Sequence, residues 1–238
     1  MRILGISLLS MVVLTVGAAQ AVGDVVADFE NGINNGNWFG INQNTWIMPT
    51  GGNPDAWLKA TEGRGEPEFQ FMPDPTNVFA GDYVSKGVTG FSVDLRADRG
   101  FDMEGSDGIG ETLRLHWTNG GDYITGIEAW YTGPASPTIG AGWQSYYYPI
   151  PSSSLTIPAG WTIYEGNGTP GTDADWQFLM HNIDAVELIY GEIGYAFPVR
   201  TWDIGMDNVR LITPEPASAL ALLIGGALLI SRRRPREL

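Results

Sequence analysis

The sequence predicts an all-β fold, a two-sheet antiparallel jelly-roll sandwich with one short helix, flanked by two apolar terminal segments. Three observations support this prediction. Apolar and polar residues alternate with a period of two along most candidate segments, which is typical of half-buried strands. Turn-forming residues, among them 32 glycines and 15 prolines in 238 residues, separate these segments. A single segment has its apolar residues at helical spacing.

Two regions give the clearest strands. Phe91–Asp98 alternates strictly between apolar and polar residues, and Thr112–Thr118 does the same. The second is followed by Asn119–Asp122 and then by the aromatic run Tyr123–Tyr131, which predicts a hairpin because Asn and Gly tolerate positive φ in the turn. The remaining predicted strands are Val25–Phe29, Trp57–Thr61, Trp143–Ile150, Trp161–Tyr164, Ala185–Glu192 and Thr201–Leu211. Strands of this number and spacing favour a jelly roll.

The predicted helix spans Asp173–Ile183, with Thr172 or Asp173 as its N-cap. In the last strand the apolar parity changes beside Gly205. A β-bulge would produce this change and would turn Asp207 or Asn208 toward the sheet edge, although an ordinary strand end explains the same pattern.

The amino terminus predicts export. Arg2, an apolar stretch Ile3–Val16 and the small residues Ala19 and Ala21 form a secretory signal peptide over residues 1–21, which the Sec machinery would recognise. The alternative is an uncleaved membrane anchor. The folded domain is then expected over residues 22–212.

Residues 213–238 form a second targeting segment. Pro214-Glu215-Pro216 precedes an apolar stretch at about 217–231, predicted as a transmembrane helix, and Arg232-Arg233-Arg234 follow it. The arginines should remain cytoplasmic by the positive-inside rule, which places the domain on the other side of the membrane. This three-part order resembles the bacterial PEP-CTERM sorting signal. The resemblance implies processing by an exosortase, an inner-membrane-anchored intermediate, and final placement at the cell surface or in the extracellular matrix of a Gram-negative bacterium. A simple carboxy-terminal anchor is the alternative.

Charge and composition exclude several functions. Residues 22–211 carry 25 acidic and 8 basic side chains, a net charge of −17. This argues against a nucleic-acid partner and favours attraction of divalent cations. The absence of cysteine excludes disulfides, thiolate zinc sites and cysteine nucleophiles.

A second resemblance concerns the domain itself. Asp28-Phe29-Glu30 and Gly205–Leu211 resemble the outer strands of jelly-roll carbohydrate-binding modules. Phe79–Arg96 and Asp175–Ile189 contain stretches that resemble the laminin IV (laminin B) domain. The resemblance implies a non-catalytic binding or matrix domain.

Modules of this kind often hold a structural calcium ion where the first and last strands meet. The matching positions here are Asp28, Glu30 and Asp207. Calcium takes roughly six to eight oxygen ligands, so backbone carbonyls or water would have to complete the site. The alternative is that these residues are ordinary solvated acids at strand edges.

A polysaccharide would be held by aromatic rings that stack on the sugar. The candidates for exposed rings are Trp38, Trp46, Trp130, Tyr146 and Tyr148, whereas Trp117 and Trp176 are assigned to the core. The alternative for any of these candidates is that it fills the core. Tyr147 must face away from Tyr146 and Tyr148 if the segment is a strand.

Catalysis has little support, because the chain has two histidines, His116 and His181, and none of the common catalytic motifs. We therefore expect an exported, non-catalytic surface or matrix protein. Glycan binding is the first hypothesis, a structural or adhesive matrix protein without a small ligand is the second, and a jelly-roll lyase or hydrolase is the third.

Overall fold

The computed structural model describes residues 24–40, 44–61, 67–100, 110–122, 125–191 and 202–213. These residues belong to one compact unit that spans Val22–Glu215. Within the described ranges, no helix combines the length and the apolar character that crossing a membrane requires.

The predicted targeting segments lie outside the described residues. They are the signal peptide at 1–21, Pro214-Glu215-Pro216, the apolar segment at 217–231 and the arginines at 232–234. Export, exosortase processing and membrane anchoring therefore stay predictions of the sequence.

Six strands form the first sheet, sheet A. Its order is β3-β4-β12-β6-β9, and β1 also pairs with β12. All of these pairs are antiparallel. The strands are β1 (Val25–Ala27), β3 (Asn44–Met48), β4 (Trp57–Thr61), β6 (Gly90–Gly100), β9 (Gln144–Pro149) and β12 (Trp202–Ile212).

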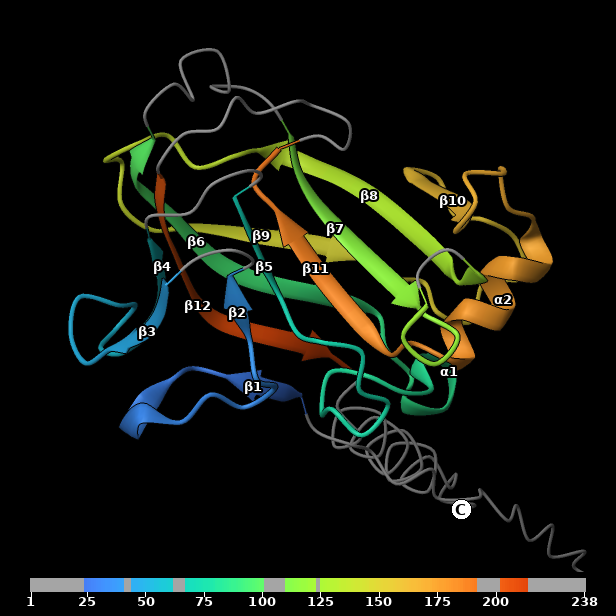
Figure 1. Cartoon of the computed structure of the whole chain (residues 1–238), viewed down its shortest axis with the longest axis horizontal. Coiled ribbons are helices and arrows are strands. Elements are labelled where there is room, and N and C mark those ends of the chain that lie inside the picture. The colour runs from blue at the N-terminus through green and yellow to red at the C-terminus, as the bar shows by residue number, and fades with distance from the viewer. Residues whose placement is uncertain are drawn as a thin grey trace, which may run out of the picture. The chain divides into compact units, whose positions relative to one another are not determined.

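Six further strands form sheet B in the order β10-β8-β7-β11-β5-β2, again with antiparallel pairs. They are β2 (Phe39–Gly40), β5 (Glu68–Gln70), β7 (Gly110–Trp117), β8 (Ile127–Ala135), β10 (Trp161–Glu165) and β11 (Ala185–Ile189). In Figure 1, β7, β8 and β11 of sheet B lie in front of β6, β9 and β12 of sheet A. The prediction of two antiparallel sheets is confirmed.

The core fills the space between the sheets. Alternation decides which side chains enter it: Phe91, Val93 and Leu95 of β6 are buried there, as are Leu113 and Leu115 of β7. Aromatic side chains contribute much of the buried volume. The ring of Trp38, for example, lies edge-on at 5.2 Å from that of Phe71 and 5.4 Å from that of Phe79.

Each predicted strand corresponds to an observed one, although some boundaries move. Trp57–Thr61 has the predicted bounds, whereas β8 begins at Ile127 rather than Tyr123. Three strands were not predicted: β2, β3 and β5. All three are short, and two lie at sheet edges, so their sequences show little alternation.

Helix α2 (Asp173–His181) confirms the predicted helix and its cap. The Thr172 hydroxyl accepts from the backbone N–H of Asp175, and the Asp175 carboxylate accepts from the Thr172 N–H at 2.7 Å, which is a capping box. The helix ends before the predicted Ile183, because Ile183 forms a β-bridge with Gly81. Two shorter helical turns are η1 (Glu30–Gly32) and α1 (Tyr83–Lys86).

Strand β12 contains the predicted bulge. Its register with β6 shifts between Asp207 and Arg210, and Asn208 has a φ of 49°. The predicted position at a sheet edge is wrong, because β12 has β6 on one side and β4 and β1 on the other. The Asp207 side chain is consequently buried rather than placed at the rim of the sheet.

Candidate functional site

The outer face of sheet B carries a cluster of charged and aromatic side chains, which we call the B face. Leu113 and Leu115 point inward, so the intervening residues of β7 point outward. The strand register then aligns their neighbours: Arg114 lies opposite Trp130 on one side and Glu187 on the other. The B face consists of Arg114, His116, Glu128, Trp130, Tyr164 and Glu187.

Arg114 is the centre of an ion-pair network on this face. Its Nη1 donates to Glu187 Oε2 at 2.8 Å, and its Nε donates to Glu128 Oε2 at 3.1 Å. His116 Nε2 lies 3.3 Å from Glu187 Oε2, and His116 Nδ1 lies 3.8 Å from Glu128 Oε2. The guanidinium and the imidazole thus connect two carboxylates on the strands that flank β7.

Interactions within this network keep its buried groups charged. The Glu187 side chain is 7% exposed and that of Arg114 is 23% exposed. Burial by itself raises the pKa of Glu187, but the interactions with His116 and Arg114 outweigh it and lower that pKa to about 2. Burial likewise opposes the charge of Arg114, and the neighbouring Glu187 and Glu128 more than compensate, so the pKa of Arg114 is raised. Glu187 and Arg114 therefore keep their charges at neutral pH.

Two aromatic rings border the network. Trp130 and Tyr164, on neighbouring strands, have ring centroids 4.8 Å apart at an interplanar angle of 41°. The Arg114 guanidinium lies 5.4 Å from the centroid of the Trp130 ring. Both rings are half-buried, and the neighbouring Thr132 and Thr162 are exposed. This side of the B face is therefore open to a ligand.

The indole N–H of Trp130 is buried and has no hydrogen-bond partner among the described residues. A buried donor without a partner costs free energy, so such a group often marks the place of a water molecule or a ligand atom. A half-exposed indole beside fixed charged groups suits a ligand that has both an apolar surface and hydroxyl groups. Sugars have both.

The predicted aromatic candidates divide into two groups. The prediction of exposure is wrong for Trp38, Tyr146 and Tyr148, which are buried in the core: the two tyrosines occupy inward positions of β9, and Trp38 packs against Phe71 and Phe79. Trp130 belongs to the B face. Trp46, on β3 of sheet A, is 48% exposed and lies opposite Lys59. The fold therefore places none of the other four candidates next to Trp130 on the B face.

The two tryptophans assigned to the core differ. Trp176 of α2 is fully buried, as predicted. Trp117 packs against the core but remains half-buried, with its ring edge-on to Phe178 at 4.7 Å between centroids.

The predicted calcium residues come close to one another, because β1 pairs with β12 and ends beside the bulge. Asp207 accepts hydrogen bonds from the backbone N–H groups of Asn53 at 2.6 Å and Asn208 at 2.7 Å. Glu30 Oε1 accepts from Ala56 N–H at 3.0 Å, and Asp28 Oδ1 accepts from Glu30 N–H at 3.2 Å.

One oxygen each of Asp28 and Glu30 and both oxygens of Asp207 therefore already accept an N–H donor, and a cation would share these carboxylates with the donors. Across the described ranges, no group of three or more histidine, aspartate or glutamate side chains is arranged to hold a metal ion. Calcium binding at Asp28, Glu30 and Asp207 stays a prediction of the sequence.

Burial raises the pKa of Asp207 to about 6, and the nearby carboxylates of Asp94 and Glu30 add to this effect, while the two backbone hydrogen bonds partly oppose it. Asp94 itself accepts from the side-chain amides of Asn53 at 3.0 Å and Asn208 at 2.9 Å. Two asparagines thereby hold two carboxylates together on the outer side of sheet A.

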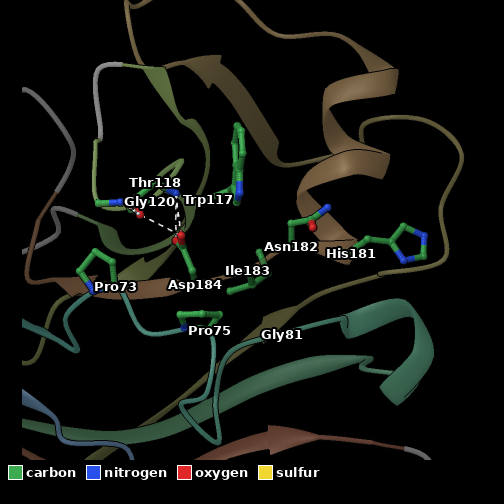
Figure 2. A pocket seen from close by; sticks show the side chains of 11 residues that line it. Pro73, Pro75, Gly81, Trp117, Thr118, Gly120, His181, Asn182, Ile183 and Asp184 are labelled. Atoms are coloured by element: carbon green, nitrogen blue, oxygen red, sulfur yellow. Dashed lines mark hydrogen bonds between the residues drawn. The ribbon is translucent and has the colours of Figure 1, made fainter.

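A pocket of about 470 Å³ lies at one end of the sandwich, where the turn after β7 meets the end of α2 (Figure 2). Figure 2 shows the Asp184 carboxylate directed at Thr118. Its two oxygens accept hydrogen bonds from the Thr118 backbone N–H at 2.9 and 3.0 Å, and one of them also accepts from the Thr118 hydroxyl at 2.8 Å. His181 Nδ1 lies 3.0 Å from Asp82 Oδ2, and the Asn182 amide donates to the Phe178 carbonyl at 2.7 Å. Because these polar groups are already bonded within the protein, they stabilise the turn and helix end rather than offer ligand contacts.

Sequence reasoning missed most of the B face. Tyr164 was assigned only to a strand, and Arg114, Glu128 and Glu187 were not linked to each other. The charged residues at outward positions of the predicted strands were the available signal. The pairing of β7 with β11, however, joins segments about 70 residues apart, and neither segment alone indicates its partner.

No family model matches the chain, and no curated protein matches it. Among solved structures, the chain is similar to part of an exo-β-agarase, with 16% identity, a TM-score of 0.46, and coverage of 79% of this chain and 24% of that chain. It is also similar to a family 30 carbohydrate-binding module of the cellulosomal cellulase Cel9D-Cel44B of Clostridium thermocellum, with 8% identity, a TM-score of 0.38 and coverage of 82% and 93%.

A third similar structure is the L4b domain of human laminin alpha-2, with 10% identity, a TM-score of 0.40 and coverage of 84% and 97%. The chain spans about a quarter of the length of the agarase. All three TM-scores are below 0.5, so none of these similarities assigns the chain to a family or an activity.

Proposed function

We propose that the domain is a non-catalytic glycan-binding jelly roll that acts at the bacterial surface or in the extracellular matrix. The observation that carries this proposal is the Trp130–Tyr164 pair beside the Arg114 network on the B face. The two rings offer an apolar surface for a sugar ring, the Arg114 network holds the Trp130 ring in place, and the exposed Thr162 beside Trp130 offers a hydroxyl.

The strand order supports the jelly-roll assignment. The order β4-β12-β6-β9 in sheet A and β5-β11-β7-β8 in sheet B leads the chain back and forth between the sheets, as two interleaved Greek keys require. In this arrangement the consecutive strands β7 and β8 contribute two residues each to the B face, and the more distant β10 and β11 add Tyr164 and Glu187.

The electrostatics of the B face favour binding over catalysis. Glycosidic cleavage needs one carboxyl group that keeps its proton near neutral pH. Glu187 has the opposite property, because Arg114 and His116 lower its pKa to about 2. It suits a fixed hydrogen-bond acceptor rather than a general acid.

The binding experiment is affinity electrophoresis of the purified full-length protein in gels that contain soluble xylan, mixed-linkage β-glucan, galactomannan or alginate. We expect retardation by at least one of these polysaccharides. Trp130→Ala and Tyr164→Ala should each weaken that retention about tenfold or more, as is typical of central aromatic contacts. Phe178→Ala removes another exposed ring, on α2, and is the matched control that should retain binding.

Failure of all four polysaccharides to retard the protein, or unchanged retention of the folded Trp130→Ala variant, would overturn the proposal. Release of new reducing or unsaturated ends during the assay would instead indicate the enzyme alternative.

We also propose that the chain is exported by the Sec machinery and sorted by an exosortase, on the strength of residues 1–21 and of Pro214-Glu215-Pro216 with its following apolar and arginine-rich segments. Intact-mass analysis of the protein from cells with and without an exosortase tests this proposal. We expect the tail beyond Pro216 to be lost only when the enzyme is present and the Pro-Glu-Pro motif is intact. An identical mass in both strains would remove the sorting proposal and leave a simple anchor.

A further inference from the structure

The outer side of sheet A has an open area that lies on the opposite side of the sandwich from the B face. We call it the A face, and its strands are β6, β9 and β12. Ser92 of β6 lies directly opposite Tyr147 of β9 on one side and Arg210 of β12 on the other. The A face consists of Ser92, Asp94, Ser145, Tyr147, Asn208 and Arg210.

The side chain of Tyr147 covers Gly90 and is exposed. A Cβ atom on Gly90 would lie 2.6–2.9 Å from Cε2, Cζ and the hydroxyl oxygen of Tyr147, so the hydroxyl end of this side chain occupies the space where a side chain at position 90 would stand. The Tyr147 hydroxyl donates to the Thr89 carbonyl at 3.3 Å, which holds this end of the side chain. Tyr147 is nevertheless 52% exposed. The hydroxyl end of the ring is therefore fixed to the protein, while about half of the side chain is accessible to a ligand.

A polar pocket of about 380 Å³ lies on the same face. Its lining includes Ser92, Asp94, Ser145, Asn208 and Arg210, and Ser92 pairs with Tyr147, which itself lies outside the lining. The Ser145 hydroxyl donates to Asp94 Oδ1 at 2.5 Å, and the Asn208 amide donates to Asp94 Oδ2 at 2.9 Å. The positive φ of Asn208 at the bulge sets the course of the backbone beside this pocket. The exposed Arg210 guanidinium is the donor that stays available to a sugar hydroxyl near the exposed Tyr147 ring.

The charges of the pocket favour an uncharged sugar. Arg210 is exposed and forms no ion pair within the described part of the chain. Asp24 and Asp94 line the same pocket, so an anionic sugar would meet a net negative charge there. On the B face, Glu128 and Glu187 likewise outnumber Arg114. Both faces, on a body of net charge −17, disfavour acidic polysaccharides.

We infer that the A face is a second glycan-contact surface and that one molecule bridges two chains of a neutral polysaccharide. The inference rests on the proposed function of the B face and adds a second site and a ligand class to it. Because the two faces point in opposite directions, a single glycan chain does not lie on both at once. Binding at both faces would cross-link a matrix and would raise the apparent affinity for dense polysaccharide by multivalency.

The test uses purified full-length protein that light scattering shows to be monomeric. The probes are the neutral polysaccharides that the B-face assay identifies, immobilised at high density, and a short soluble oligosaccharide made from them, with alginate as the anionic comparison. We expect calorimetry to give two oligosaccharide sites per chain for the wild type. Tyr147→Ala and Trp130→Ala should each leave one site and lose roughly a hundredfold in apparent affinity for the dense polysaccharide.

Tyr147→Phe is the matched control. It keeps the ring on Gly90 and removes the hydroxyl, so it should retain both sites. One site in the wild type, together with an unaffected Tyr147→Ala variant, would overturn the bridging inference and leave the B-face proposal intact. Two sites that both survive Trp130→Ala would instead remove the B face from the proposed function. Equal binding of alginate would overturn the assignment to neutral polysaccharides.

Discussion

Sheets A and B each direct an arginine outward from a central strand, and the two arginines have different environments. Arg114 of β7 is half-buried and is bonded to Glu128 and Glu187. Arg210 of β12 is exposed and forms no ion pair within the described ranges. The difference shows that burial, rather than residue type, decides whether a charged side chain stabilises the fold or stays available to a ligand.

The aromatic residues of the two faces differ in the same way. Trp130 is partly enclosed, leans against Tyr164 and keeps a buried N–H without a partner in the described residues. Tyr147 covers Gly90 with its hydroxyl end and is half exposed. An enclosed ring with an unsatisfied donor restricts which sugar can bind, whereas a flat open ring accepts many. We therefore expect the B face to determine specificity and the A face to add contact area.

The largest expected effect distinguishes the two arginines. Arg114→Ala leaves the buried carboxylate of Glu187 without one of its two partners, Arg114 and His116, and loss of one member of a buried ion pair typically costs about 3 kcal/mol or more. Arg210→Ala removes an exposed side chain and should change the free energy of unfolding by less than about 0.5 kcal/mol. Urea unfolding of both variants measures the difference.

Combining Arg114→Ala with Glu187→Gln provides the control, because the second substitution removes the uncompensated charge. The double variant should recover part of the lost stability. Equal and small losses of unfolding free energy for Arg114→Ala and Arg210→Ala would mean that the Arg114 network is as solvated as Arg210. The proposed difference between the two faces would then be wrong.

A second effect concerns Glu111, which lies on β7 with Arg114 but points inward between the sheets. It is fully buried, accepts one hydrogen bond from the Ser136 hydroxyl at 3.1 Å, and has a second carboxyl oxygen without a partner among the described residues. Burial raises its pKa well above 4.5, and the Ser136 bond only partly opposes this. A carboxyl group with a raised folded-state pKa contributes stability that is complete below its unfolded pKa and is lost as the pH rises toward the folded one.

We therefore expect the melting temperature of the wild type to fall as the pH rises above 4.5 toward the raised pKa of Glu111. Each unit by which the folded pKa exceeds the unfolded value corresponds to about 1.4 kcal/mol. Asp207 acts in the same direction, but with a pKa of about 6 its contribution is largely lost by pH 6. Glu111→Gln should stabilise the protein at pH 8 and flatten the slope, and an unchanged slope would show that Glu111 ionises freely in the folded state.

A smaller difference in the free energy of unfolding is expected between glycine substitutions in the covered part of sheet A and in the open A face. A Cβ on Gly205 would lie 2.6 Å from the ring of Trp57 and 2.7 Å from Arg96, and that buried ring is held by its N–H bond to the Thr50 carbonyl. Gly205→Ala should therefore cost about 1–3 kcal/mol, as overpacking does.

Gly90→Ala should cost less, because the exposed ring of Tyr147 can move outward. Displacing that ring should nevertheless weaken binding at the A face. Greater destabilisation by Gly90→Ala than by Gly205→Ala in urea unfolding would contradict the assignment of Tyr147 to an open surface.

Much of the fold was predictable because alternation is a local property. The alternation in Phe91–Asp98 shows which side of that strand faces the core, and the capping box at Thr172 shows where α2 begins. Strand β5 could not be identified in this way, because only one of its three residues is apolar and both of its outward residues are polar.

The candidate site was less predictable, because it depends on which strands become neighbours. Tyr146, Tyr147 and Tyr148 illustrate the limit: the sequence shows that Tyr147 opposes the other two, but the pairing of β9 with β6 decides that Tyr147 is the exposed one. The bulge was detectable from the parity change in β12, whereas its central place in sheet A follows only from pairing with β6, β4 and β1.

The smallest expected effect is that of calcium on the melting temperature, through the carboxylates of Asp28, Glu30 and Asp207. N–H donors already take part of the acceptor capacity of Asp28, Glu30 and Asp207, so fewer lone pairs remain for a bound ion. We expect the melting temperature to be the same in millimolar calcium and in excess chelator, since an ion that binds only the folded state must raise it. Magnesium serves as the control for charge screening. A rise in melting temperature that is specific to calcium and is abolished by Asp28→Asn would support the calcium site that the sequence predicts. It would also mean that the carboxylates of sheet A can bind a cation, in contrast to Glu128 and Glu187 of the B face, which are already paired with Arg114.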